Sequence, residues 1–186
     1  MATQPTETIH TPALQLAGKP IPELFSMYAA IADELRQRGI MRTSNNLVGD
    51  LAEYLFSQAM GWKLSDNSQC GYDAVAEDED TKTTFQVKGR RLTPQNPSRQ
   101  LGALRDLELD GSFDYLAAVL FNPDYTVQRA IILPRHQVLQ ASTFVERTNS
   151  HKFHLLDKAW GLPGAQDVTE RLRAVVWTST ELETHS

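Results

Sequence analysis

The sequence predicts an α/β or α+β domain in which helices flank a mixed central sheet. Two amphipathic helical segments come first, and several β-rich runs follow them. The chain then returns to helical spacing in "PRHQVLQAS" and "DVTERLRAV". Helical segments that come before and after a run of strands in the sequence are typical of domains in which helices pack on a sheet. The predicted order of elements is α-α-β-β-β-(α)-β-β-α.

The first two helices are predicted from apolar residues that recur every three or four positions. The first runs from Pro22 to Arg38, has Gly39 as its stop, and carries apolar residues at helical spacing, namely Leu24, Phe25, Tyr28, Ile31, Ala32 and Leu35. The second is capped by Thr43 or Ser44, is ended by Gly61, and should bury Leu47, Leu51, Tyr54, Leu55 and Ala59. We expect the stripe of the second helix to contribute to the core.

The strands are predicted from composition and alternation. "WKLS" is a short strand, "YDAVA" alternates, and "TTFQVKG" is rich in β-branched and aromatic residues. "FDYLAAVLF" and "TVQRAIIL" flank the turn signal "NPDY", which predicts a hairpin. Between the third and fourth strands we expect a loop and a short helix capped by Ser98.

Length and composition indicate a single globular domain at residues 19–180, between tails at 1–18 and 181–186. A chain of 186 residues that is 41% hydrophobic is large enough to bury a core. No apolar run reaches the length of a membrane span, the first residues lack the features of a signal peptide, and Cys70 is the single cysteine. We therefore expect a cytoplasmic protein with no membrane partner.

Charge is unevenly distributed along the chain. The net charge of −5 argues against a broad nucleic-acid-binding surface. From Thr81 to Arg105, however, there are six Lys and Arg residues and no Asp or Glu. A solvated loop is the ordinary explanation of such a run, and a local binding patch is the alternative. No GxxxxGK phosphate loop occurs, so no nucleotide cofactor is expected.

A candidate site starts from Gln86 and Lys88, which stand two residues apart in a β-rich run. On a strand they point to one face, while Phe85 and Val87 point to the other face and can enter the core. The preceding strand offers Asp73 as a neighbour across the hairpin. A half-buried lysine is costly unless a carboxylate, a metal or a phosphate compensates it.

A second carboxylate is expected from the helix that precedes these strands. Glu53 lies beside the apolar stripe, four residues after Gly49, whose missing side chain should permit a close approach to the sheet. Two neighbouring carboxylates repel each other unless a cation lies between them. Oxygen ligands of this kind suit Mg²⁺ or Mn²⁺.

Glu53 on a helix, followed by Asp73, twelve residues and Gln86-x-Lys88, resembles the PD-(D/E)XK nuclease superfamily. The resemblance covers residues 40–135 and implies a restriction-endonuclease-like αβββαβ core. Gln86 departs from the Asp or Glu of the motif, and some restriction-type and repair-type members carry this variant. The stretch from "NSQCGYDAV" to "FDYLAAVLF" also resembles a small bacterial group of restriction-endonuclease-like proteins.

The resemblance implies a metal-dependent DNA endonuclease that acts in restriction, defence or DNA processing. Asp73 and Gln86 would bind Mg²⁺ or Mn²⁺, and Glu53 would do so directly or through water. Lys88 would orient or deprotonate the attacking water, or offset charge in the transition state. The DNA backbone would be bound by Arg90, Arg91, Arg99 and Arg105. A homodimer is a further expectation, because cutting both strands needs two sites.

Two other interpretations stay open. A chain with this fold can bind nucleic acid or a protein partner without cleavage, which Gln86 and the acidic net charge favour. Alternatively, Glu53 and Lys88 are solvated, Asp73 is a turn residue, and the chain has no site. His151 and His154 have the spacing of a metal pair, but the sequence offers no third ligand, so an ordinary surface or loop pair is expected.

Overall fold

The computed structural model describes residues 16, 18–43, 46–65, 71–77, 81–108 and 112–175. Ser44 and Cys70 lie outside these ranges, and so do nearly all residues of the predicted tails at 1–18 and 181–186. No helix within the described ranges is long and apolar enough to cross a membrane.

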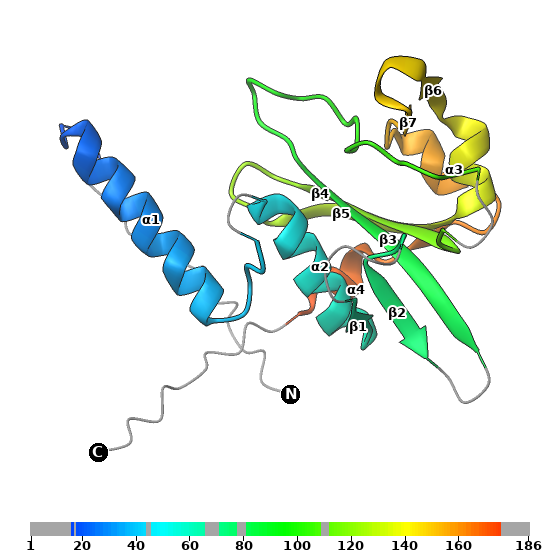
Figure 1. Cartoon of the computed structure of the whole chain (residues 1–186), viewed down its shortest axis with the longest axis horizontal. Coiled ribbons are helices and arrows are strands. Elements are labelled where there is room, and N and C mark those ends of the chain that lie inside the picture. The colour runs from blue at the N-terminus through cyan, green and yellow to red at the C-terminus, as the bar shows by residue number, and fades with distance from the viewer. Residues whose placement is uncertain are drawn as a thin grey trace, which may run out of the picture.

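Within the described residues, a six-stranded mixed sheet forms the centre of the protein (Figure 1). Its spatial order is β1 (Lys63–Leu64), β2 (Ala74–Glu77), β3 (Lys82–Arg91), β4 (Tyr115–Phe121), β5 (Val127–Pro134) and β8 (Gln166–Asp167). Strands β3 and β4 are parallel, and the other neighbouring pairs are antiparallel. The predicted α/β class with a mixed sheet is confirmed, and so are the hairpins β2–β3 and β4–β5.

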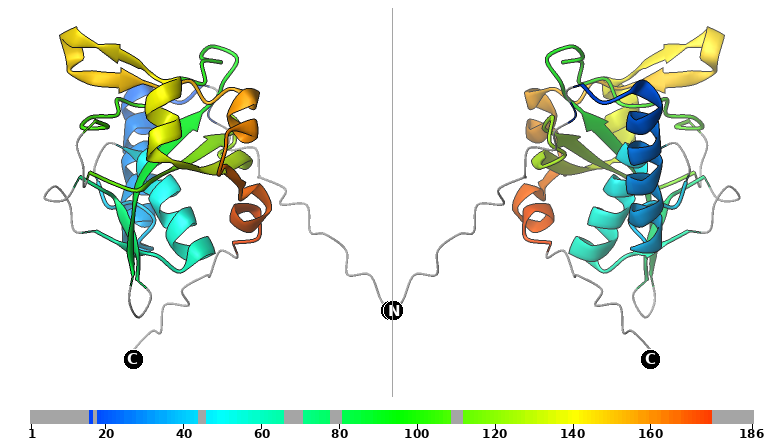
Figure 2. Two further views of the ribbon diagram at one scale, coloured as in Figure 1. Left: turned by 90° about the vertical axis from the view of Figure 1, so that its right-hand side faces the viewer. Right: turned by 90° about the vertical axis from the view of Figure 1, so that its left-hand side faces the viewer.

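One face of the sheet is covered by α2 (Leu47–Met60) and α4 (Thr169–Arg173), as Figure 2 shows. Gly89 on β3 permits a close approach of α2, because a Cβ at this position would lie 2.7 Å from the carbonyl oxygen of Val48. Small and large apolar residues of α2 fill the interface with the sheet, namely Leu51, Ala52, Leu55 and Phe56.

The opposite face is covered by α3 (Arg135–Ala141), a 3₁₀ turn at Asp157–Gly161 and the segment 92–108. That segment buries three leucines in this layer, Leu101, Leu104 and Leu107. A small antiparallel hairpin adjoins the layer and consists of β6 (Thr143–Val145), a 3₁₀ turn at Glu146–Thr148 and β7 (Ser150–Lys152).

The short helix expected between the third and fourth strands is wrong. Residues 92–108 form an irregular loop, in which Leu104 exchanges two backbone hydrogen bonds with His151, of 3.1 and 2.7 Å. A leucine at every third position resembles helical spacing, but these bonds to a distant segment satisfy the backbone without a helix. The Ser98 hydroxyl accepts from the N–H of Gln100 at 3.3 Å and caps no helix.

Helix α2 begins at a cap that differs from the predicted one. Asn46 is the N-cap, and its side chain accepts from the N–H of Gly49 at 3.2 Å. Thr43 accepts in turn from the N–H of Asn46 at 3.2 Å. The expected role of Gly49 at the sheet is wrong, because a Cβ there would first meet the Asn46 side chain, at 2.1 Å. Gly89 fills that role, and Gly61 ends α2 at φ 71° as predicted.

Helix α1 (Ile21–Gln37) forms within one residue of its predicted bounds, and Gly39 follows it at φ 71°. Most of its apolar stripe stays outside the core. Ala32 is the one residue of α1 that is buried, whereas three large residues of the stripe are 71%, 64% and 51% exposed, namely Phe25, Tyr28 and Ile31. Figure 1 shows α1 standing apart from the sheet.

Candidate active site

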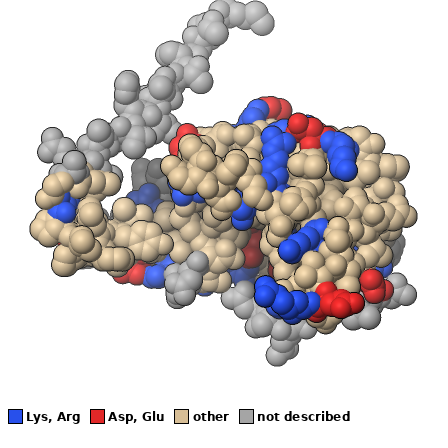
Figure 3. Space-filling view, turned by 90° about the horizontal axis from the view of Figure 1, so that it is seen from above, with Lys and Arg blue, Asp and Glu red and all other residues tan. Residues whose placement is uncertain are grey.

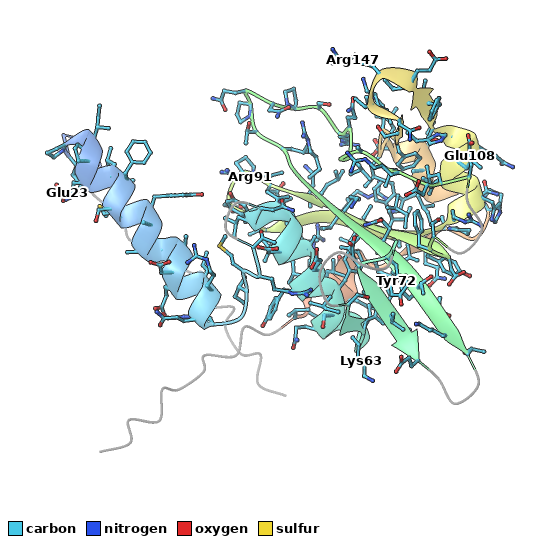
Figure 4. The ribbon with its side chains drawn as sticks, viewed as in Figure 1. Glu23, Lys63, Tyr72, Arg91, Glu108 and Arg147 are labelled. Carbon is cyan, nitrogen blue, oxygen red and sulfur yellow. The ribbon has the colours of Figure 1, made fainter. Side chains whose placement is uncertain are left out.

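Three of the four predicted site residues meet where β2 begins beside β3, next to Tyr72, which is labelled in Figure 4. One carboxylate oxygen of Asp73, Oδ2, accepts hydrogen bonds from the side-chain amide of Gln86 and from the N–H of Val87, the latter at 2.8 Å. The Lys88 ammonium lies 3.7 Å from the same oxygen. The structure therefore gathers an amide and an ammonium around a single carboxylate oxygen.

Strand geometry accounts for this convergence. Gln86 and Lys88 are two residues apart on β3, so their side chains share a face of the sheet, and the antiparallel pairing of β2 places Asp73 beside them. Their neighbours on β4 are Leu116 and Ala118, which are fully buried. The side chains of Lys88 and Asp73 are 25% and 29% exposed, so the carboxylate compensates an ammonium that is partly withdrawn from water.

Glu53 reaches the same region from α2. Its side chain is 19% exposed, and Oε2 lies 3.1 Å from the guanidinium of Arg42. Burial raises the pKa of Glu53, and the Asp73 carboxylate raises that pKa further, while Arg42 and then Lys88 lower it. Because the charges of Asp73 and Lys88 both act on its pKa, Glu53 belongs to their electrostatic neighbourhood.

Two further charged residues belong to this region, although no sequence motif identifies them. Arg42 ties Glu53 to the main chain, since its Nη2 also donates to the carbonyl oxygen of Ser65 at 2.8 Å. Asp50 is 1% exposed and accepts from the N–H and from the hydroxyl of Thr43, both at 2.9 Å. An acid in the first turn of a helix is common at the surface, so the sequence carries no signal that Asp50 is buried.

We call this group the Asp73 cluster: Arg42, Asp50, Glu53, Asp73, Gln86 and Lys88. With all of its ionisable groups charged, three carboxylates face two cations, which leaves one negative charge uncompensated. Burial is the main cause of the raised pKa of Glu53, and the neighbouring carboxylates of Asp73 and Asp50 raise it further; a proton on Glu53 would offset the excess charge. A bound cation would offset the same charge.

The donors of the cluster suit a hard divalent cation. Within the described part of the chain, three side chains each keep one oxygen without a hydrogen-bond partner: Asp73 Oδ1, Gln86 Oε1 and Glu53 Oε1. Carboxylate and amide oxygens are ordinary ligands of such ions. The described residues contain no group of three His, Cys, Asp or Glu side chains that could hold a metal, so a metal here depends on the Gln86 amide.

Arg90 and Arg91, which were both predicted to bind DNA, lie on opposite faces of β3 because they are consecutive. Arg90 donates to the carbonyl oxygen of Ser98 at 2.9 Å. The Arg91 guanidinium lies 4.2 Å from the ring centroid of Tyr125, toward the end of β3 that is remote from Tyr72 (Figure 4). The two arginines therefore face different surroundings.

The other two predicted DNA-binding arginines belong to the 92–108 loop. Arg99 pairs with Asp157 at 2.7 Å, and Arg129 contacts the same carboxylate at 3.3 Å. Arg105 is exposed on the 92–108 loop. Figure 3 shows Lys and Arg atoms interspersed with Asp and Glu atoms on one face of the protein. The structure does not gather the four arginines into one patch.

His151 and His154 do not face each other as a metal pair. His151 is buried in β7, and its Nδ1 lies 3.0 Å from the hydroxyl of Ser142. His154 is exposed. The two side chains differ in burial and do not lie on a helix. Their spacing in the sequence therefore does not make them a pair of metal ligands.

Comparison with known proteins adds no function to this geometry. No family model matches the chain, and no curated protein matches it. The positions and charges of the Asp73 cluster therefore carry the functional argument.

Proposed function

We propose that this protein is a metal-dependent endonuclease that hydrolyses phosphodiester bonds in DNA at the Asp73 cluster. The observation that carries the proposal is the excess of one carboxylate over the cations in the Asp73 cluster, next to the ammonium of Lys88. A site that attracts a cation beside a fixed ammonium suits a phosphodiester, whose hydrolysis requires neutralisation of oxygen charge.

Asp73, Glu53 and the Gln86 amide are the proposed ligands of Mg²⁺ or Mn²⁺. A metal held by these oxygens would raise the fraction of hydroxide and would neutralise charge that develops on the phosphate oxygens. Arg42 holds Oε2 of Glu53 and leaves Oε1 available as a ligand. Lys88, held beside Asp73, orients the attacking water or offsets charge on the phosphate.

DNA binding is proposed to be weak and sensitive to salt. Arg105 is exposed, and Lys88 is partly exposed at the cluster itself. Arg90, Arg91 and Arg99 reach a phosphate by exchanging contacts that they already make within the protein. Because phosphate contacts release counterions, the dissociation constant should rise steeply with ionic strength.

The same geometry favours a second function, a nuclease-like fold that binds nucleic acid or a protein without cleaving DNA. The specific observation is that Gln86, Val87 and Lys88 all converge on Oδ2 of Asp73. With a proton on Glu53, the cluster is electrically balanced without a metal. An amide in place of a third carboxylate also weakens the attraction for a divalent ion.

Calorimetric titration with Mn²⁺ and cleavage of plasmid DNA separate these functions. We expect one Mn²⁺ site in the natural protein, tighter binding in Gln86→Glu, and no binding in Asp73→Asn. Cleavage should fall in Asp73→Asn by on the order of 10²–10³. Glu77→Gln is the matched control, because Glu77 is an acid at the exposed end of β2 that pairs with Lys63 at 3.0 Å.

Circular dichroism of each variant shows whether the fold survives the substitution. Folded protein that neither binds Mn²⁺ nor cleaves DNA, with no gain of binding in Gln86→Glu, would contradict the endonuclease and support the second function. Equal Mn²⁺ binding by Asp73→Asn and the natural protein would place the metal outside the cluster.

A further inference from the structure

The 92–108 loop begins with a tight turn just past the end of β3. Thr93 and Asn96 close the turn as an antiparallel bridge, with backbone hydrogen bonds of 3.2 and 3.0 Å in the two directions. Pro94 and Gln95 are its two corners, and both are exposed. We call residues 93–96 the tip. Figure 1 shows the green segment that follows β3 rising beyond the end of the sheet.

The tip is braced from within the protein. The Arg90 guanidinium donates to the carbonyl oxygen of Ser98 at 2.9 Å and to Oδ1 of Asn96 at 2.8 Å. The N–H of Asn96 also donates to the hydroxyl of Thr93 at 3.1 Å. The ring of Pro94 fixes the backbone of the first corner. A turn that is held in this way loses little conformational freedom on binding, which lowers the cost of recognition.

The bracing arginine belongs to the strand face that carries the candidate site. Gln86, Lys88 and Arg90 alternate along β3, so their side chains share one face. The returning part of the loop also passes Lys88, because a Cβ at Gly102 would lie 4.0 Å from Cδ of Lys88. The end of β3 is three residues beyond Lys88, about 10 Å along an extended strand. The tip therefore stands beside the Asp73 cluster, a little further along the same strand.

The chemistry of the tip suits the base edges of DNA. No Asp or Glu occurs from Thr81 to Arg105, so no acid of this segment repels a phosphate backbone. The Gln95 side chain makes no hydrogen bond within the described part of the chain. A glutamine amide donates and accepts at once, and it can pair in this way with N6 and N7 of adenine in the major groove.

We propose that the tip enters the major groove of double-stranded DNA beside a phosphate at the Asp73 cluster, and that Gln95 contacts a base edge there. This inference rests on the proposed function and names duplex DNA as its substrate. The major groove is about 12 Å wide and admits a two-stranded ribbon, and the tip consists of two bridged segments. The separation of about 10 Å between Lys88 and the end of β3 matches a phosphate and the adjoining groove. A single strand has no groove for the tip.

DNA binding without divalent metal, so that no cleavage occurs, tests the inference. A preferred duplex is first selected from a library of random sequence. Fluorescence anisotropy then compares it with its separate strands and with duplexes that are changed at one base pair. We expect the preferred duplex to bind about tenfold more tightly than duplexes that lack one particular adenine. Equal affinity for the duplex and its single strands overturns the proposal.

Gln95→Ala tests the contact itself. It should weaken binding of the preferred duplex about tenfold and leave the salt dependence unchanged, because the amide carries no charge. Gln37→Ala is the matched control, because it removes the same amide from an exposed position at the end of α1, and it should change neither. Circular dichroism checks that both variants fold. If Gln95→Ala binds every duplex as the natural protein does, the proposal is overturned.

Mn²⁺ calorimetry and plasmid cleavage on the same proteins separate this inference from the proposed function. Mn²⁺ binding and cleavage, together with unchanged duplex binding by Gln95→Ala, overturn this inference alone. A base preference that depends on Gln95, in a protein that neither binds Mn²⁺ nor cleaves DNA, supports the tip and contradicts the endonuclease. A natural protein that binds no DNA overturns the inference together with the DNA substrate.

Discussion

Helices α1 and α2 follow one another in the chain and have similar spacing of apolar residues, yet α2 packs in the core and α1 is largely exposed. Helix α2 has 14 residues, is capped by the Asn46 side chain, and packs on β3 with Ala52 and Phe56 fully buried. Helix α1 has 17 residues, has no side-chain hydrogen bond at its N-cap, Pro20, and exposes Phe25. Apolar residues recur every three or four positions in both helices.

The difference shows what apolar periodicity determines and what it leaves open. Apolar periodicity indicates that one face of a helix favours burial against another surface, because apolar surface is unfavourable in water. It does not state which surface provides the cover. For α2 the cover is the sheet, where Gly89 leaves room for Val48 and Ala52. For α1 the described part of the same chain provides no cover beyond the C-terminal end of the helix.

The largest expected effect contrasts one phenylalanine from each helix. Phe56→Ala should lower the free energy of unfolding by about 3–5 kcal/mol, because the buried ring leaves a cavity beside Trp62, its stacking partner. Phe25→Ala should change it by no more than about 0.5 kcal/mol, because the ring is in water. Urea unfolding followed by tryptophan fluorescence, at low protein concentration, measures both. Equal losses would show that α1 packs on the body.

A smaller effect is expected where α2 approaches the sheet. Gly89→Ala should lower the free energy of unfolding by about 1–3 kcal/mol, because its Cβ would press on the backbone of Val48. Gly102→Ala is the control, because the nearest atom to a Cβ there is Cδ of Lys88, at 4.0 Å. The same urea titration compares them. A neutral Gly89→Ala would mean that α2 lies further from β3.

The smallest expected effect is a pH dependence that comes from Glu53 on α2. Its pKa in the folded protein is raised above the ordinary value of 4.5, chiefly by burial. As pH rises from 4.5 towards the raised pKa, the unfolded chain loses its proton first, so the free energy of unfolding falls. Glu53→Gln should remove that fall, and Glu23→Gln, in an exposed ion pair on α1, should not.

Urea midpoints measured from pH 4 to pH 7 provide the comparison, and the difference between the natural protein and Glu53→Gln isolates one carboxyl group from the others. A difference that stays constant with pH would show that the surroundings of Glu53 do not perturb it. A difference that grows in favour of the natural protein as pH rises would mean that the sign of the shift is opposite.

The core of the candidate site was predictable because it depends on local rules. A spacing of two residues sets Gln86 and Lys88 on one face of a strand, and a short hairpin sets Asp73 beside them. The same rule explains why the arginines that were predicted to bind DNA do not all lie on one surface. Arg90 and Arg91 are adjacent in the sequence, so a strand sends them to opposite faces.

The sequence by itself determined the helices α1 and α2 and the pairing of the two hairpins, because these depend on periodicity and on residues near one another in the chain. Tertiary structure alone decided that α1 exposes its stripe, that 92–108 is a loop bonded to His151, and that Arg42 clamps Glu53. These outcomes depend on contacts between segments far apart in the sequence. Such contacts form where surfaces match in shape and charge, which no local pattern records.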